Sequence, residues 1–229
     1  MKSKKRKTSF TIHSKLMKNI FLILAIVSFF SILILSSATS LVFDKKSYFK
    51  EQEKSKVYED LNKSLAQNVT INVIDYFRYE ETLGTDFFNE DEKLHMQDVK
   101  SLINKITIAY YISIFLLVVF FILYYNTTKD FSRSLSSVLI FGSIFTIVIF
   151  IMLYFANFSF LFDRFHLIFF ESNYLFPADS NIIRLFPESF FSGIFFLILK
   201  VAFIKTIILL FAGILINSLE YFSRIHARP

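Results

Sequence analysis

The chain has 229 residues, of which 54% are hydrophobic and 32 are phenylalanine, and it contains only four glycines. This composition lies far outside that of soluble domains, and the apolar residues come in long blocks, so we predict an integral membrane protein. The absence of cysteine excludes a disulfide framework and a thiol nucleophile. The formal net charge of +6 reflects a basic N-terminal tail with no folded basic module around it, so we expect no nucleic-acid partner.

Four apolar blocks are each long enough to cross a bilayer. A spanning helix needs about 20 predominantly apolar residues to cross roughly 30 Å of hydrocarbon. The sequence therefore predicts an all-α membrane protein, a single membrane domain over residues 1–229, with four transmembrane helices. The predicted spans cover residues 20–42, 106–125, 138–156 and 193–218.

The segment before the first span carries seven lysines or arginines and no acid, which places it in the cytoplasm by the positive-inside tendency. A cleaved signal peptide is the alternative, because small residues at 36–38 follow the apolar run, but that run is longer than the apolar region of such peptides. We therefore expect an uncleaved anchor in the cell membrane. Alternate crossings then make residues 1–19, 126–137 and 219–229 cytoplasmic and residues 44–105 and 157–192 extracytoplasmic.

The first extracytoplasmic segment mixes ten basic with thirteen acidic residues, as a solvated region does. Apolar residues at three- and four-residue spacing predict an amphipathic helix over residues 47–67. Thr70–Tyr79 is β-branched and aromatic and could form a strand, so we expect a mostly helical region with room for a short strand pair. A further helix over residues 89–105 leads into the second span and carries His95 and Asp98.

The second extracytoplasmic segment is both aromatic and polar, and it holds His166. Pro177 and Pro187 prevent one uninterrupted helix over Phe158–Phe191, so we expect an irregular loop at the membrane surface. Spans joined by a short turn run antiparallel, and their outer ends are neighbours. His95 and His166 are therefore expected to meet, although each could also be an ordinary loop histidine.

Two stretches carry extended motifs. The first is FFNEDEKLHMQDVK at residues 87–100, and the second is FHLIFF at 165–170, continued by NYLF at 173–176 and LFPESFF at 185–191. They resemble the F-N-E-x-E-x-x-H-M-x-D-V-K signature and the F-H-x-x-F-F, N-x-W-x-F and L-x-P-x-x-F-F pattern of the lipoprotein intramolecular transacylase family, four-span bacterial membrane enzymes. The order of loops and spans also fits, so the resemblance covers essentially the whole chain.

The chain departs from the family pattern at two places. Tyr174 stands where the pattern often has tryptophan, and residues 177–180 match its D-P-x-x-D run only loosely. These departures concern the role of Asp179 and the floor of the loop, but they leave both histidines in place.

The resemblance implies an acyltransferase. Its reaction would move an acyl chain from the sn-2 ester of a diacylglyceryl-cysteine lipoprotein to the α-amino group of the same cysteine, which gives a lyso-form lipoprotein. The implied partners are the diacylated lipoprotein and the lipid bilayer, and we expect a monomer with no cofactor and no metal. The amine is largely protonated at neutral pH and needs a base, while the leaving oxygen needs a proton, and histidine suits both tasks.

Our mechanistic hypothesis makes His166 the general base and His95 its partner, which orients it or protonates the leaving oxygen, and the two roles could be exchanged. Asp98 could accept a hydrogen bond from His95 or pair with a lysine instead. Asn173 and Tyr174 could donate hydrogen bonds to the developing oxyanion, or serve only the structure of the loop.

Two lysines of the fourth span and three phenylalanines beside His166 add further candidates. Lys205 lies near the middle of the fourth span, where a charge is costly unless it is paired or lines a polar cavity. We predict that it faces the bundle, whereas Lys200 can reach the membrane surface. Phe165, Phe169 and Phe170 are candidates for contacting the acyl chain, with core packing as the alternative for each.

Two other function classes remain open at this stage. A non-catalytic assembly protein could dock through residues 44–105 and would need no paired histidines. A membrane hydrolase is the other alternative, although the chain has no Gly-x-Ser-x-Gly elbow, no HExxH motif and no cysteine.

Overall fold

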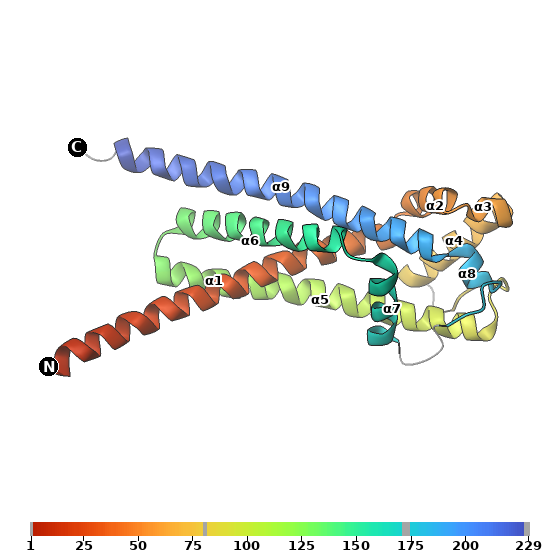
Figure 1. Cartoon of the computed structure of the whole chain (residues 1–229), viewed down its shortest axis with the longest axis horizontal. Helices are drawn as coiled ribbons and strands as arrows, with labels where there is room; N and C mark the ends of the chain where they lie inside the picture. Colours follow the sequence, from red (N-terminus) through yellow and green to blue (C-terminus); the bar gives the residue numbers. More distant parts are fainter. Residues whose placement is uncertain (1, 80–81, 171–174, 227–229) are drawn as a thin grey trace. The chain divides into compact units, whose positions relative to one another are not determined.

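The computed structural model describes residues 2–79, 82–170 and 175–226, with side chains from residue 15 onward. All regular structure in these residues is α-helical, which confirms the predicted fold class of an all-α membrane protein. Figure 1 shows the helices in chain order: α1 (Lys2–Val42), α2 (Lys45–Lys54), α3 (Val57–Asp60), α4 (Lys63–Arg78), α5 (Glu90–Thr128), α6 (Phe131–Tyr154), α7 (Phe158–Phe169), α8 (Asn181–Leu185) and α9 (Glu188–His226).

Four of these helices are long and apolar enough to cross a membrane, namely α1 from Lys15 onward, α5, α6 and α9. Each carries one of the predicted spans, although the third prediction runs two residues past Tyr154, where α6 ends. α5 and α9 have 39 residues each. At about 1.5 Å per residue such a helix is roughly 58 Å long, so both must extend well beyond the hydrocarbon of a bilayer.

The chain forms two compact units. The span unit comprises Met1–Ile34, Ala109–Ile151 and Ala202–Pro229, and the loop unit comprises Leu35–Ile108 and Met152–Val201. Each unit packs its own core.

Small residues allow close helix contacts in the span unit. A Cβ atom added at Gly142 would lie 2.7 Å from the ring of Phe29, so a larger residue there would push α6 away from α1. Ser143 on α6 donates a hydrogen bond of 3.4 Å to the carbonyl of Thr206 on α9. These features are typical of membrane helices, which associate through small residues and interhelical hydrogen bonds.

The loop unit is built around a separate apolar core. Leu185 and Phe190, at most 2% exposed, pack there against side chains from α3, α4 and α5. One polar group is enclosed with them: the Gln52 amide on α2 donates to Thr70 on α4 at 2.8 Å and accepts from the hydroxyl of Tyr58 at 3.2 Å. Because a buried amide needs partners, this cluster fixes α2 against α4.

The prediction of one helix over residues 47–67 is wrong. The chain forms α2, then α3, and α4 begins at Lys63. Lys56 adopts a left-handed conformation with φ of 61°, which ends the first helix. Asn62 then caps α4 by accepting a hydrogen bond from the N–H of Leu65 at 3.2 Å.

The predicted strand at Thr70–Tyr79 is also wrong, because α4 continues to Arg78. Apolar residues recur at helical spacing through this stretch and face the core of the loop unit. Burying one face of a helix outweighs the modest preference of β-branched residues for strands. The buried side chains along this face are Ala66, Val69, Val73, Tyr76 and Phe77.

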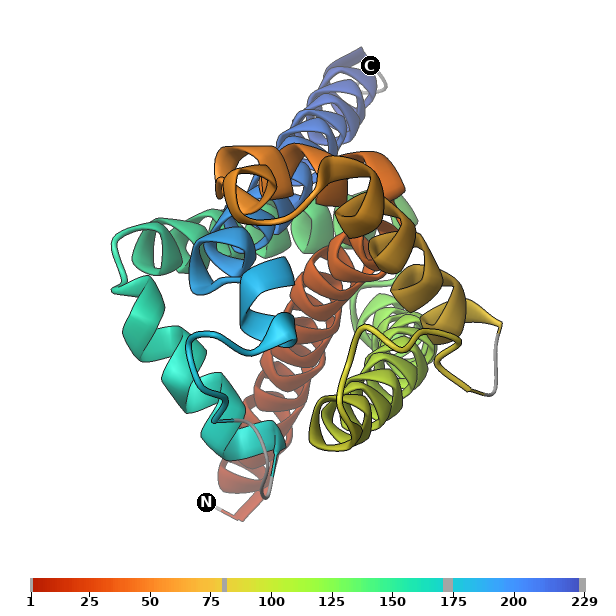
Figure 2. The ribbon, with the colours of Figure 1, turned by 90° about the vertical axis from the view of Figure 1, so that its right-hand side faces the viewer.

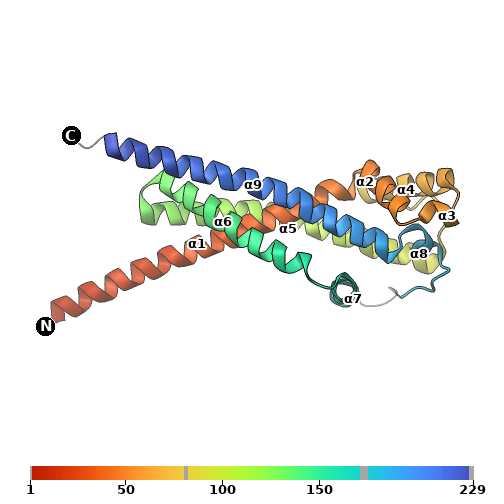
Figure 3. The same ribbon diagram turned by 45° about the horizontal axis from the view of Figure 1, so that its top comes forward.

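The segment Phe158–Phe191 is more regular than the predicted loop. It begins with α7, whose N-terminus is capped by Asn157 accepting from the N–H of Phe160 at 2.9 Å, and it also contains α8. Figures 1 and 3 show that α7 runs across the direction of the first turns of α9, and Figure 3 views it along its axis. Several large apolar side chains of α7 are exposed, as in a helix that lies in a membrane interface; they include Phe160, Leu167, Ile168 and Phe169.

Candidate active site

His95 lies in the second turn of α5 and is 7% exposed. Its ring packs against Phe170, at 4.8 Å between centroids, and against Phe176 at 5.4 Å. Among the described residues its buried Nδ1 atom has no hydrogen-bond partner. Buried polar atoms are normally satisfied, so this nitrogen is suited to meet a group that a ligand or a water molecule supplies.

His166 lies in the last turn of α7. Its Nδ1 is 2.8 Å from the carbonyl oxygen of Phe162, one turn earlier. A carbonyl only accepts, so Nδ1 donates, and in the neutral ring the lone pair is on Nε2. The helix thus holds the ring in the tautomer that a general base needs.

The two histidines come together as the topology predicted. Their ring centroids are 6.4 Å apart and their planes differ by 15°. His95 lies outside the predicted span, and its pKa is lowered to about 4. Burial is the main cause, and the nearby His166 acts in the same direction, whereas the negative charge of Asp98 raises the pKa. His95 is therefore neutral at pH 7, and two positive charges on these neighbouring rings would repel.

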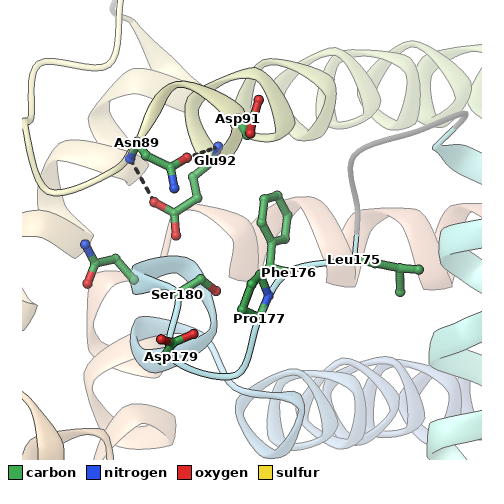
Figure 4. Close-up of a pocket in the computed structure, with 9 residues that line it drawn as sticks. Asn89, Asp91, Glu92, Leu175, Phe176, Pro177, Asp179 and Ser180 are labelled. Atoms are coloured by element: carbon green, nitrogen blue, oxygen red, sulfur yellow. Dashed lines mark hydrogen bonds between the residues drawn. The ribbon is translucent and has the colours of Figure 1, made fainter.

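Glu92 positions the start of α5, and the sequence reasoning did not identify it. The carboxylate is 1% exposed. Its Oε2 accepts from the N–H of Asn89 at 2.8 Å, and the Asn89 side chain accepts from the N–H of Glu92 at 2.9 Å, which forms a reciprocal cap (Figure 4). Its Oε1 accepts from the N–H of Ile182 in α8 at 2.9 Å, so one carboxylate joins the helix that carries His95 to α8.

A cavity of about 460 Å³ lies beside this junction (Figure 4). Phe176 lines this cavity and also packs against the ring of His95, so the cavity adjoins the histidine pair. Its wall is acidic, and Asp179 is part of it. The lining residues are Asn89, Asp91, Glu92, Leu175, Phe176, Pro177, Asp179, Ser180 and Asn181.

Within the described residues, the structure does not show contacts between the histidines and the polar residues predicted to support them. Asp98 is exposed, and no hydrogen bond joins it to His95 in the described part of the chain. Asn173 and Tyr174 lie outside the described residues. Lys205 belongs to the span unit, where it is half-buried. Within residues 2–79, 82–170 and 175–226 no three histidine, aspartate or glutamate side chains are grouped as metal ligands.

The three phenylalanines predicted to contact an acyl chain occupy different environments. Phe170 is buried and touches both histidine rings. The ring centroid of Phe165 lies 5.7 Å from that of His166, and the ring centroids of Phe169 and Phe165 are 4.9 Å apart. Phe170 and Phe165 therefore share the apolar surroundings of the pair with Phe176, beside His95, and with Phe162, whose ring centroid is 4.3 Å from that of His166.

Fold and site together define a multi-pass membrane protein in which the short helix α7 brings one histidine to another in the second turn of a helix that is long and apolar enough to span a membrane. The family model of the lipoprotein intramolecular transacylase Lit matches residues 22–191, which is most of the chain, and the chain belongs to this family.

Solved structures of the membrane integral lipoprotein intramolecular transacylase Lit from Bacillus cereus share the fold. A form in which one histidine is replaced by arginine matches with a TM-score of 0.74 and 21% identity, covering 96% of this chain and 99% of that one. A form with alanine at a mutated histidine matches with a TM-score of 0.73 and 21% identity, covering 94% and 99%. No curated protein sequence matches the chain significantly.

Proposed function

We propose that this chain transfers an acyl chain from the sn-2 ester of a diacylglyceryl-cysteine lipoprotein to the α-amino group of the same cysteine. The family to which the chain belongs supports lipoprotein transacylation. The observation that carries the finer proposal is the pairing of His95 and His166 among apolar rings in the loop unit. Such a site suits a substrate that combines a lipid ester with a protonated amine.

In the proposed reaction, the substrate ammonium group first loses one proton to solvent, and Nε2 of His166 then accepts a second proton from the attacking amine. The amine nitrogen then forms a bond to the ester carbonyl carbon. The bond from that carbon to the sn-2 glycerol oxygen breaks, and this oxygen takes the proton. The products are an amide and a free hydroxyl in the same molecule, and no water is consumed.

His95 is the second participant. Because it is neutral at pH 7, it does not compete with His166 by adding a second positive charge. Its buried Nδ1 has no partner among the described residues and can hydrogen-bond the reacting groups. We assign it to orienting the substrate or His166, or to passing the proton held by His166 on to the leaving oxygen. Supporting roles for Asp98, Asn173 and Tyr174 stay predictions.

The apolar surroundings favour this chemistry. Phe170 packs on both histidines, and Phe165 flanks His166. Rings at these positions exclude water, which would otherwise compete with the amine for the ester. We further propose that the site faces the extracytoplasmic side, with both termini in the cytoplasm, and that the protein acts as a monomer.

The test is mass spectrometry of the N-terminal peptide of a diacylated model lipoprotein, expressed with and without this protein. The intact protein should give the N-acylated lyso form. His95→Ala and His166→Ala should each lower the yield by about 10²–10⁴-fold, the usual contribution of a general acid or base.

His226→Ala is the matched control, because His226 makes the same kind of bond, from Nδ1 to the carbonyl of Phe222, at the exposed end of α9. The control should retain full activity, and all variants should remain in the membrane. Normal lyso-form product from either site variant would refute the assignment. Release of free fatty acid without amide formation would indicate a hydrolase.

A further inference from the structure

A second cavity, of about 570 Å³, lies in the loop unit between α2 and the first turns of α9. Figures 1 and 2 show these two helices side by side. The lining residues fall on one face of each helix, at three- and four-residue spacing. They are Ser47, Lys50, Glu51 and Lys54 on α2 with Ser55 directly after it, and Ser189, Ser192, Gly193, Phe196, Leu197 and Lys200 on α9.

The groove has a built floor, where Glu51 meets Gly193. A Cβ atom at Gly193 would lie 2.2 Å from Oε2 of Glu51, so only glycine leaves room for this carboxylate. Glu51 is 4% exposed, and its Oε1 is 2.6 Å from Nζ of Lys54. The one negative charge in the groove is thus already matched by a lysine.

Two further lysines leave the groove positively charged. Lys50 and Lys200 are exposed and form no ion pair with any described residue. The three lysines and one carboxylate of the lining leave a net charge of two positive charges in the groove. Four serines add hydroxyl groups around them. Ammonium groups and hydroxyl donors around a small space match the oxygens of a phosphate group.

The α9 wall of the groove also carries apolar side chains, on a helix that is apolar and long enough to cross a membrane. Phe196 and Leu197 line it, and Lys200 follows Ser189 by eleven residues, which is roughly 16 Å along α9. A lysine within the end of a span reaches toward the headgroups while its stem contacts acyl chains. The groove therefore offers cations for a headgroup and apolar side chains for a fatty acyl tail.

We propose that this groove binds one anionic phospholipid, with its phosphate group at Lys50 and Lys200 and an acyl chain against Phe196 and Leu197, which lie between Gly193 and Lys200 on α9. The site is separate from the histidine pair and does not depend on the proposed acyl transfer. A lipid bound there would stay with the purified protein, in the groove between α2 and α9.

The experiment measures lipid retention by native mass spectrometry on the full-length protein, titrated with phosphatidylglycerol or with phosphatidylcholine. The intact protein should retain one phosphatidylglycerol in preference to phosphatidylcholine. Each lysine near an anionic headgroup contributes about a fivefold factor in affinity, so the double variant Lys50→Gln with Lys200→Gln should bind phosphatidylglycerol roughly 25-fold more weakly.

The matched control is Lys46→Gln with Lys105→Gln. It removes the same number of exposed, unpaired lysines from α2 and from near the end of a predicted span, but neither residue lines the groove. The control should bind phosphatidylglycerol as the intact protein does. Equal weakening in both double variants would mean that overall charge, not the groove, attracts the lipid, and would overturn the proposal.

Two further arms separate the remaining possibilities. Ser192→Phe fills the groove without changing charge and should also abolish retention, so this variant carries the test if the lysine variants fail to fold. Inorganic phosphate should not displace the bound lipid. Displacement by phosphate, or equal retention of phosphatidylcholine, would show that the groove does not select an anionic lipid.

Discussion

Acid should destabilise this protein through His95, because the folded chain buries that residue in its neutral form. Burial lowers the pKa of His95 to about 4, whereas a histidine in an unfolded chain titrates near pH 6.5. Between these two values the unfolded chain holds a proton that the folded chain does not, so lowering the pH favours unfolding. The stability is present above about pH 6.5 and is lost as the pH falls toward 4.

The size of the effect follows from the two pKa values. One pKa unit corresponds to about 1.4 kcal/mol, so the complete loss is about 3 kcal/mol, of which about 2 kcal/mol is already lost at pH 5. For a chain of about this length, 1 kcal/mol shifts Tm by roughly 2–4 °C. His95 should therefore account for a decrease in Tm of roughly 4–8 °C between pH 7 and pH 5.

Thermal unfolding of the detergent-solubilised protein at pH 7 and pH 5 measures this decrease. His95→Gln removes the titrating group, so its Tm should fall by less than that of the intact protein over the same pH interval. His226→Gln, at the exposed end of α9, should behave like the intact protein. If all three proteins show the same change in Tm, His95 is not buried in its neutral form.

Two further substitutions test contacts that hold the loop unit together. Glu92→Ala leaves the N–H groups of Asn89 and Ile182 without their acceptor and should lower stability by about 2–4 kcal/mol in thermal unfolding. Glu92→Gln can accept only one of these bonds through its amide oxygen, so its stability should lie between that of the intact protein and that of Glu92→Ala. A glutamine variant as unstable as the alanine variant would contradict this account. Gly193→Ala should cost about 1–3 kcal/mol because its Cβ meets Glu51. Adding Glu51→Ala should recover most of that loss of Tm, and an absence of recovery would place the strain elsewhere.

The spanning helices and the meeting of the two histidines followed from local information in the sequence. Apolar blocks of about 20 residues specify spans because lipid leaves the backbone no other way to satisfy its hydrogen bonds. An odd or even number of crossings then decides which loops share a side. His95 and His166 could be placed together by this reasoning without knowing any side-chain contact.

The errors arose where tertiary packing decides the structure. Thr70–Tyr79 has the residue types of a strand, but its buried positions follow helical spacing and pack into the core of the loop unit as part of α4. The break at Lys56 depends on a single left-handed residue, for which a lysine gives no signal in the sequence.

The role of Glu92 lies between these cases. An asparagine followed three residues later by glutamate is a recognisable capping box, so the bond to Asn89 could have been predicted. The bond to Ile182 could not, because it joins segments that are distant in the sequence. The contact between Glu51 and Gly193 likewise has no signature in either local sequence.

α5 continues without a break from the turn that carries His95 into the predicted second span. His95 precedes the predicted span at residue 106 by eleven residues, which is roughly 16 Å of helix. The headgroup layer is only about 5–8 Å deep on each side of the hydrocarbon. A reaction at a lipid ester, beside an α7 that exposes apolar side chains, would therefore require α5 to be tilted or the span to begin before residue 106. In the proposed reaction, the rings of Phe170 and Phe176 would then take the place of neighbouring lipids around the lipid-modified cysteine.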